Sequence, residues 1–224
     1  PGEFYSMFKL DGKDAAAAYT LRQDQKAHGV PPHWMLYIAT DNVDDSARRV
    51  SELGGTVIAQ PFDVMDVGRM AVVQDPTGVH FCLWQAKRSP GIAARNTDGA
   101  FCWADLNTPD VARAGEFYTK LFGWTLEKDE KDPSGYTHIK NGDEYIGGIP
   151  SAEHLNPNAP PHWLLYFETS NCDASVEKAK RNGAQVFFGP ESMENVGRFA
   201  VLSDPQGAVF SLFQSARKAN VGAA

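Results

Sequence analysis

The chain has 224 residues, a net charge of −7 and three cysteines. It contains no block of Lys and Arg that could bind a nucleic-acid backbone, and no apolar run long enough to span a membrane. Three cysteines without a CxxC pair favour a reducing, cytoplasmic location over a disulfide-stabilised secreted fold. The length suits two domains of roughly 100 to 120 residues each.

A hairpin is the first predicted element. Two extended runs, Tyr5–Lys9 and Ala15–Tyr19, flank Asp11-Gly12, and Asp-Gly between extended runs is a strong hairpin signal. A buried strand is expected over Met35–Thr40, followed by a helix with Asp41 or Asn42 as its N-cap. The helix has apolar residues at helical spacing, Val43, Ala47, Val50 and Leu53, and Gly54-Gly55 ends it. Three strands are expected after it, over Thr56–Ile58, Gly68–Gln74 and Val79–Gln85. The sequence therefore predicts a β-α-β-β-β motif.

The second half contains two more such motifs. One has a strand over Ala100–Asn107, a helix capped by Thr108 and ended by Gly123, a strand over Trp124–Glu127 and a hairpin. The other covers Trp163–Phe213. The first half has one complete motif preceded only by its hairpin, so internal symmetry predicts about 35 further residues, a strand, a helix and a strand, before Pro1.

The last motif repeats an earlier one. Shifting the sequence by 129 residues aligns 33–86 with 162–215 without a gap, and 22 positions are identical. The identities include His33/His162, Gly54/Gly183, Gly68-Arg69/Gly197-Arg198, Asp75-Pro76/Asp204-Pro205 and Gln85/Gln214. A repeat this long indicates duplicated domains rather than a solenoid. We predict an N-terminal domain over 1–95 and a C-terminal domain over 96–224.

Three features together resemble the vicinal oxygen chelate superfamily, which includes glyoxalase I, bleomycin resistance proteins and extradiol dioxygenases. They are Phe117-Tyr118 with Leu121-Phe122-Gly123-Trp124, the repeated Gly-Arg-x-Ala-Val, and the repeated Asp-Pro-x-Gly. The resemblance covers nearly the whole chain and is nearest to tandem two-domain glyoxalase-like proteins. It implies an α+β fold in which paired β-α-β-β-β motifs form curled mixed sheets around a cleft, with the first domain lacking its leading strand-helix-strand.

Metal-binding members of that superfamily take ligands from the first and last strands of each motif. In this sequence those positions carry residues that cannot supply a ligand set: Met35, Cys82, Trp103, Leu164 and Ser211. The sequence therefore predicts no bound metal or other cofactor.

Several residues remain candidates for chemistry. Asp105 lies on a strand expected to face the second cleft, either as a general base or as a buried, hydrogen-bonded acid; Glu168 is the other candidate base. Cys82 with His80 could form a nucleophile pair, although a lining role is favoured because both lie on one strand. Arg69 and Arg198 could bind an anion, but bracing a turn is favoured, and a structural hydrogen bond is favoured for His33 and His162. The expected ligand-binding residues are Tyr37, Cys82, Trp84, Trp103, Asp105, Tyr166, Ser211 and Phe213.

The sequence predicts that the protein binds a small organic molecule without metal, as drug-binding resistance proteins of the superfamily do. Two alternatives stay open: a lactoylglutathione lyase-like enzyme or isomerase acting on a small carbonyl compound, and a module whose clefts are filled by side chains. The expected partner is a small molecule, with neither nucleic acid nor membrane, and a homodimer stays open.

Overall fold

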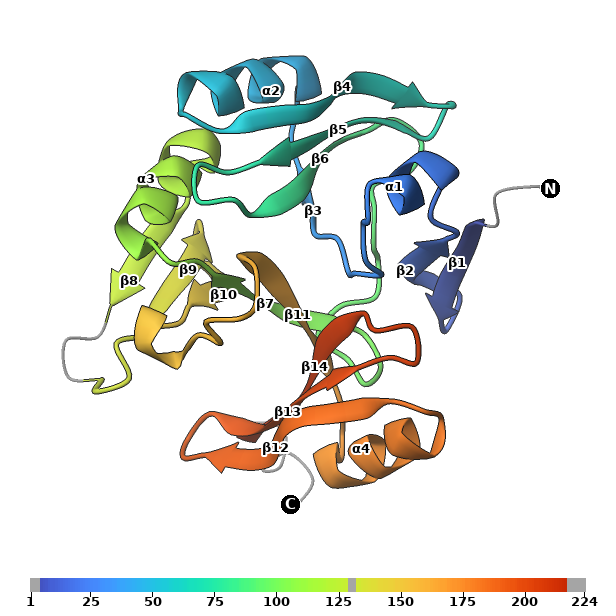
Figure 1. The fold of residues 1–224 in the computed structure, drawn as a ribbon, viewed down its shortest axis with the longest axis vertical. Helices are drawn as coiled ribbons and strands as arrows, with labels where there is room; N and C mark the ends of the chain where they lie inside the picture. Colours follow the sequence, from blue (N-terminus) through green and yellow to red (C-terminus); the bar gives the residue numbers. More distant parts are fainter. Residues whose placement is uncertain (1–4, 129–131, 217–224) are drawn as a thin grey trace. The chain divides into compact units, whose positions relative to one another are not determined.

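The computed structural model describes residues 5–128 and 132–216 (Figure 1). The strands are β1 Tyr5–Leu10, β2 Lys13–Tyr19, β3 Tyr37–Ala39, β4 Thr56–Val64, β5 Gly68–Gln74, β6 His80–Ala86, β7 Phe101–Asn107, β8 Thr125–Lys128, β9 Thr137–Asn141, β10 Glu144–Ile149, β11 His162–Glu168, β12 Gln185–Met193, β13 Gly197–Ser203 and β14 Val209–Ser215. The helices are α1 Gln23–Ala27, α2 Val43–Glu52, α3 Val111–Phe122, α4 Cys172–Arg181 and the short 3₁₀ helix Ala152–His154. Except for α1 and the 3₁₀ helix, these are the elements that the sequence predicts.

The chain divides into two compact units that are interleaved in sequence. Unit 1 consists of 1–34, 92–103 and 165–224, and unit 2 of 35–91 and 104–164. Strand β7 thus begins in unit 1 and ends in unit 2, and β11 begins in unit 2 and ends in unit 1. The tandem boundary near residue 95 stays a prediction.

Each β-α-β-β-β motif is a mixed sheet with its first and last strands adjacent and parallel. In unit 2 the strand orders are β3-β6-β5-β4 and β7-β10-β9-β8, and unit 1 holds β12-β13-β14-β11 with the separate hairpin β1-β2. The pairs β3/β6, β7/β10 and β11/β14 are parallel, and the remaining described pairs within the motifs are antiparallel. Helices α2 and α4 lie against the sheets of their own motifs. The predicted α+β class with curled mixed sheets is confirmed.

The core of unit 2 is aromatic. Phe81 of β6 is fully buried, and its ring centroid lies 5.5 Å from that of Tyr118 and 6.3 Å from that of Phe117, both on α3. Tyr118 also stacks on Trp124 at 5.7 Å, and its hydroxyl accepts a hydrogen bond from Nε1 of Trp163. Helix α3 therefore joins two motifs into one core. The smaller core of unit 1 contains Cys172, Val176, Ala200 and Leu202.

Helix caps show where local sequence signals decide the structure. Asn42 caps α2, because its side chain accepts from the Asp45 backbone N–H, as predicted. The N-cap of α3 is Asp110 rather than Thr108, so that prediction is wrong. The Thr108 hydroxyl instead donates to Thr77 Oγ1 at 2.9 Å, which leaves the Asp110 carboxylate to accept from the Arg113 backbone N–H. Gly123 ends α3 in the left-handed conformation, with φ of 74°.

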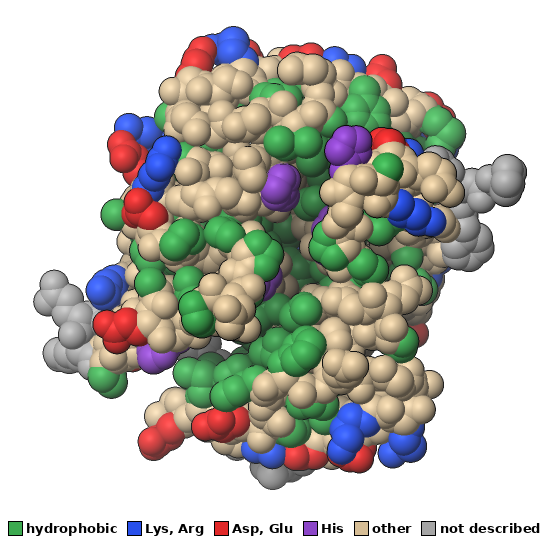
Figure 2. Space-filling view, in the orientation of Figure 1, with side chains coloured by type: hydrophobic (Ala, Val, Ile, Leu, Met, Phe, Trp, Pro, Cys, Tyr) green, Lys and Arg blue, Asp and Glu red, His purple; other side chains and the backbone are tan. Residues whose placement is uncertain are grey.

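None of the helices in the described ranges is long and apolar enough to cross a membrane. On the face drawn in Figure 2, basic side chains lie beside acidic ones around α2 and α4 rather than forming a continuous basic patch.

Candidate functional site

One face of the sheet β7-β10-β9-β8 gathers ionisable and aromatic side chains in unit 2. Register places Asp105 of β7 beside Gly148 of β10, Gly148 beside His138 of β9, and His138 beside Glu127 of β8. Since alternate strand residues point to opposite faces, this row projects from one side of the sheet. The neighbouring row, which includes Leu126 and Ile139, projects from the other side, where Leu126 approaches Gly115 of α3. We call the first side the polar sheet face.

A buried carboxylate lies at one end of the polar sheet face. Asp105 is 6% exposed, and its Oδ1 accepts a hydrogen bond of 2.6 Å from the Tyr136 hydroxyl. The Tyr136 ring lies over Gly148, where an added Cβ would overlap its hydroxyl group. Glycine at 148 therefore makes room for the tyrosine that reaches Asp105.

Aromatic rings continue from this pair across the face. The ring of His138 lies 5.0 Å from Tyr136 and 5.3 Å from Tyr145, in both cases edge to face. The Tyr145 hydroxyl donates to Glu127 Oε2 at 2.8 Å, and this bond raises the pKa of Tyr145. Lys140 lies over the Tyr145 ring at 4.9 Å. The face thus presents aromatic surface together with donors and acceptors at both ends.

The sequence-predicted residues of unit 2 lie in two places. Asp105 is on the polar sheet face, whereas Tyr37, Cys82 and Trp84 are neighbours on β3 and β6. The rings of Tyr37 and Trp84 meet edge to face at 6.3 Å, and Nε1 of Trp84 donates to the Ser89 carbonyl. That this second group binds a ligand stays a prediction.

The sequence-predicted residues of unit 1 lie on β7, β11 and β14. Tyr166 lies beside Ser211 in register and meets Phe213 edge to face at 6.4 Å. Ser211 is fully buried, with its hydroxyl donating to the Ala200 carbonyl at 2.9 Å. Glu168 is 6% exposed, and its backbone N–H donates to the Ala100 carbonyl beside the start of β7, the strand that carries Trp103. Roles in binding for this group stay predictions.

The repeated arginines and histidines have structural partners. Arg69 binds Asp44 through two hydrogen bonds of 2.8 Å, and Arg198 binds Asp173 in the same way. His33 Nδ1 lies 2.8 Å from the Pro31 carbonyl oxygen, and His162 Nδ1 lies 2.8 Å from that of Pro160. The predicted structural hydrogen bond of the two histidines is confirmed. The arginines also have structural partners, but the two aspartates are helix residues, so the paired hydrogen bonds of each arginine join a strand to a helix and do not brace a turn.

Tyr136 and His138 were not among the sequence candidates. They lie 31 and 33 residues from Asp105 along the chain, and only the pairing of three strands brings them together. The sequence feature that could have indicated this contact is the pair Gly147-Gly148 inside a strand, because glycine in a strand often marks the close approach of another group. Within the described part of the chain, no cluster of three or more His, Cys, Asp or Glu side chains has the arrangement of a metal site.

Cys82 should be unreactive in the folded protein. It is 2% exposed, and burial raises the pKa of its thiol to about 12. At pH 7 the thiolate is then roughly one part in 10⁵, and thiolate is the form that alkylates. We expect iodoacetamide to label Cys82 only after denaturation, as measured by peptide mass spectrometry. Rapid labelling of Cys82 in the native protein, in step with the half-buried Cys102, would contradict this burial.

Two family models match the sequence. The model described as "Glyoxalase/Bleomycin resistance protein/Dioxygenase superfamily" matches residues 101–212, and the model described as "Glyoxalase-like domain" matches residues 8–84. The chain belongs to the glyoxalase/bleomycin resistance protein/dioxygenase superfamily, as the sequence motifs indicate.

Two relatives carry names that bear on function. A Mycobacterium tuberculosis protein named "Putative glyoxylase CFP32" is 41% identical over 218 residues, covering 96% of this chain and 82% of its own length. The Streptomyces peucetius protein named "Anthracycline biosynthesis protein DnrV" is 34% identical over 226 residues, covering 94% and 79%.

Solved structures share the fold. The 2,2',3-trihydroxybiphenyl 1,2-dioxygenase of Sphingomonas wittichii aligns with a TM-score of 0.56 at 15% identity, covering 84% of this chain and 72% of its own. The Mn(II)-bound glyoxalase of Novosphingobium aromaticivorans aligns with a TM-score of 0.55 at 19% identity, covering 80% and 61%. At these identities the likeness concerns the fold alone.

Proposed function

We propose that the chain binds a small, planar organic molecule on the polar sheet face of unit 2. The observation that carries the proposal is the run of three edge-to-face rings, Tyr136, His138 and Tyr145, which begins at the buried Asp105 carboxylate. Aromatic surface with a few placed polar groups is the usual composition of small-molecule sites. The name of the Streptomyces relative, which refers to anthracycline biosynthesis, supports a planar ligand.

The test is an absorbance titration with alizarin, a coloured planar quinone that carries two hydroxyl groups. Tyr136→Phe removes the hydroxyl that donates to Asp105 and keeps the ring. We expect saturable binding by the wild type and an affinity about tenfold lower for Tyr136→Phe. The variant removes a hydroxyl from the binding surface and leaves the buried Asp105 without this donor, and the loss of one hydrogen bond has an effect of this order. Tyr19→Phe, on the hairpin of unit 1, is the matched control and should bind like the wild type. Equal binding by both variants would refute the assignment to this face.

A second function, proton transfer on a small carbonyl compound, is favoured by the Tyr136–Asp105 hydrogen bond. A carboxylate that is 6% exposed is poorly hydrated, which suits a general base. The single O–H of Tyr136 donates to Asp105 in this structure, and in the reaction it would turn from Asp105 to donate to the carbonyl oxygen of the substrate. In this reaction Asp105 would remove the proton from the carbon next to the carbonyl and return it to the former carbonyl carbon. The name of the mycobacterial relative supports a substrate of the glyoxalase type.

A further inference from the structure

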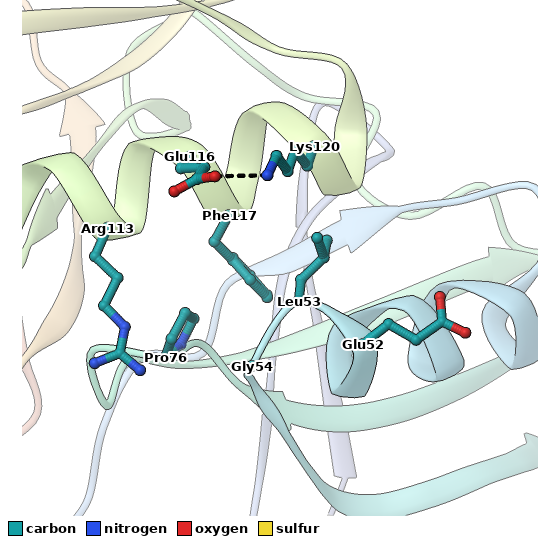
Figure 3. Close-up of a pocket in the computed structure, with 8 residues that line it drawn as sticks. All are labelled: Glu52, Leu53, Gly54, Pro76, Arg113, Glu116, Phe117 and Lys120. Carbon is teal, nitrogen blue, oxygen red and sulfur yellow. Dashed lines mark hydrogen bonds and ion pairs between the residues drawn. The ribbon is translucent and has the colours of Figure 1, made fainter.

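A groove in unit 2 lies between the C-terminal end of α2 and one face of α3 (Figure 3). Its volume is about 390 Å³, and its walls are formed by Glu52, Leu53, Gly54, Pro76, Arg113, Glu116, Phe117 and Lys120. The four residues from α3 occupy positions i, i+3, i+4 and i+7, so they share one side of the helix. Arg49 of α2 donates to the Lys120 backbone carbonyl, which ties the two helices together beside the groove.

Two cations, Arg113 and Lys120, line the groove, and only Lys120 has an ion pair among the residues that the structure describes. Glu116 is paired with Lys120 at 2.5 Å, and Glu52 is paired with Arg48 of α2 at 2.6 Å. Among the residues that the structure describes, no carboxylate forms an ion pair with Arg113. Figure 3 shows the Arg113 side chain extending from α3 toward Pro76, away from the Glu116–Lys120 pair. Arg113 is therefore the lining cation that no described carboxylate neutralises through an ion pair.

Apolar groups lie beside this cation. Pro76 and Leu53 are partly buried, and the Phe117 ring, which points from α3 into the space between the two helices, is 2% exposed and closes the floor of the groove. A volume of about 390 Å³ is at the lower end of the range for small-molecule sites, roughly 300 to 1,000 Å³. The guanidinium group of arginine matches the geometry of a carboxylate and binds it through two hydrogen bonds.

We propose that the groove binds a small organic carboxylate whose body is about one aromatic ring in size, with Arg113 holding the carboxylate and Pro76 and Leu53 contacting the body. The groove is on the α3 side of the sheet β7-β10-β9-β8, and Asp105 projects from the polar sheet face on the other side. This second site is therefore independent of the function proposed above.

The probe is 4-fluorobenzoate, observed by fluorine NMR at neutral pH, with 4-fluorobenzamide as its uncharged analogue. We expect the wild type to bind the benzoate saturably, and Arg113→Gln to bind it about tenfold more weakly. A tenfold loss of affinity is at the low end for a hydrogen-bonded charge pair, because the groove is open to solvent. Arg113 is exposed, so the variant should fold normally. The benzamide should bind the wild type several-fold more weakly than the benzoate.

Arg181→Gln on α4 in unit 1 is the matched control, since it removes the same charge from an exposed helix position. It should keep wild-type affinity, as should Asp105→Asn. Lack of saturable binding by the wild type, equal affinity for Arg113→Gln, equal affinity for benzamide and benzoate, or an equal loss in Arg181→Gln would each overturn the proposal. If alizarin binding fails while benzoate binding and its loss in Arg113→Gln hold, the function proposed for the sheet face falls and the groove proposal stands.

Discussion

Replacing Phe81 with alanine should lower the free energy of unfolding by about 3–5 kcal/mol, the usual cost of removing a buried phenylalanine. The ring is fully buried and contacts Phe117, Tyr118 and Phe122 of the neighbouring motif, at centroid distances of 6.3, 5.5 and 6.1 Å. The loss corresponds to a fall in Tm of roughly 6 to 20 °C for a chain of this size.

The matched control is Phe62→Ala. Phe62 lies on β4 and is 43% exposed, so its removal leaves no buried cavity and should cost less than about 1 kcal/mol. Both variants can be measured by urea unfolding followed by tryptophan fluorescence. Equal stability of the two variants would mean that α3 does not join the two motifs into one core.

Replacing Asp105 with asparagine should lower any isomerase or lyase turnover by 10² to 10⁴, the usual contribution of a general base. Asparagine keeps an oxygen that can accept from the Tyr136 hydroxyl, so the local hydrogen bond survives while the capacity to take up a proton is lost. The assay follows thioester formation from the hemithioacetal of methylglyoxal and glutathione. Wild-type protein without turnover would eliminate this second function and leave the binding proposal.

Cys82→Ser is the control for that assay, because a buried thiol with a pKa near 12 is not a nucleophile at neutral pH. It should retain wild-type turnover. An inactive Cys82→Ser variant together with an active Asp105→Asn variant would reverse the assignment of roles.

Local signals in the sequence were sufficient for most of the fold. The Asp11-Gly12 hairpin, the Asn42 cap and the glycine that ends α3 each depend on residues within one turn, and the structure has all three. The cap of α3 was mispredicted because Thr108 has a partner, Thr77, that is 31 residues away. A helix cap can be read from its own residues only when no distant group competes for the side chain.

The candidate site was less predictable. Alternation along one strand was enough to select Asp105, but the contact with Tyr136 depends on the register of β7, β10 and β9 and on the missing side chain at Gly148. Similarly, the groove beside Arg113 forms because α2 and α3, which belong to different motifs, pack next to each other in one core. Both features arise from the packing of segments far apart in the chain, and the spacing of residues in the sequence does not indicate which of these segments lie close together.

The central claim, that a small organic molecule binds on the polar sheet face, is tested most directly by NMR of protein labelled with ¹³C in its tyrosine rings, during titration with alizarin. The signals of Tyr136 and Tyr145, assigned from their phenylalanine variants, should shift with saturation. The signal of Tyr118, which is buried in the aromatic core beneath α3, should stay unchanged. Saturable binding that leaves both Tyr136 and Tyr145 unshifted would contradict the account.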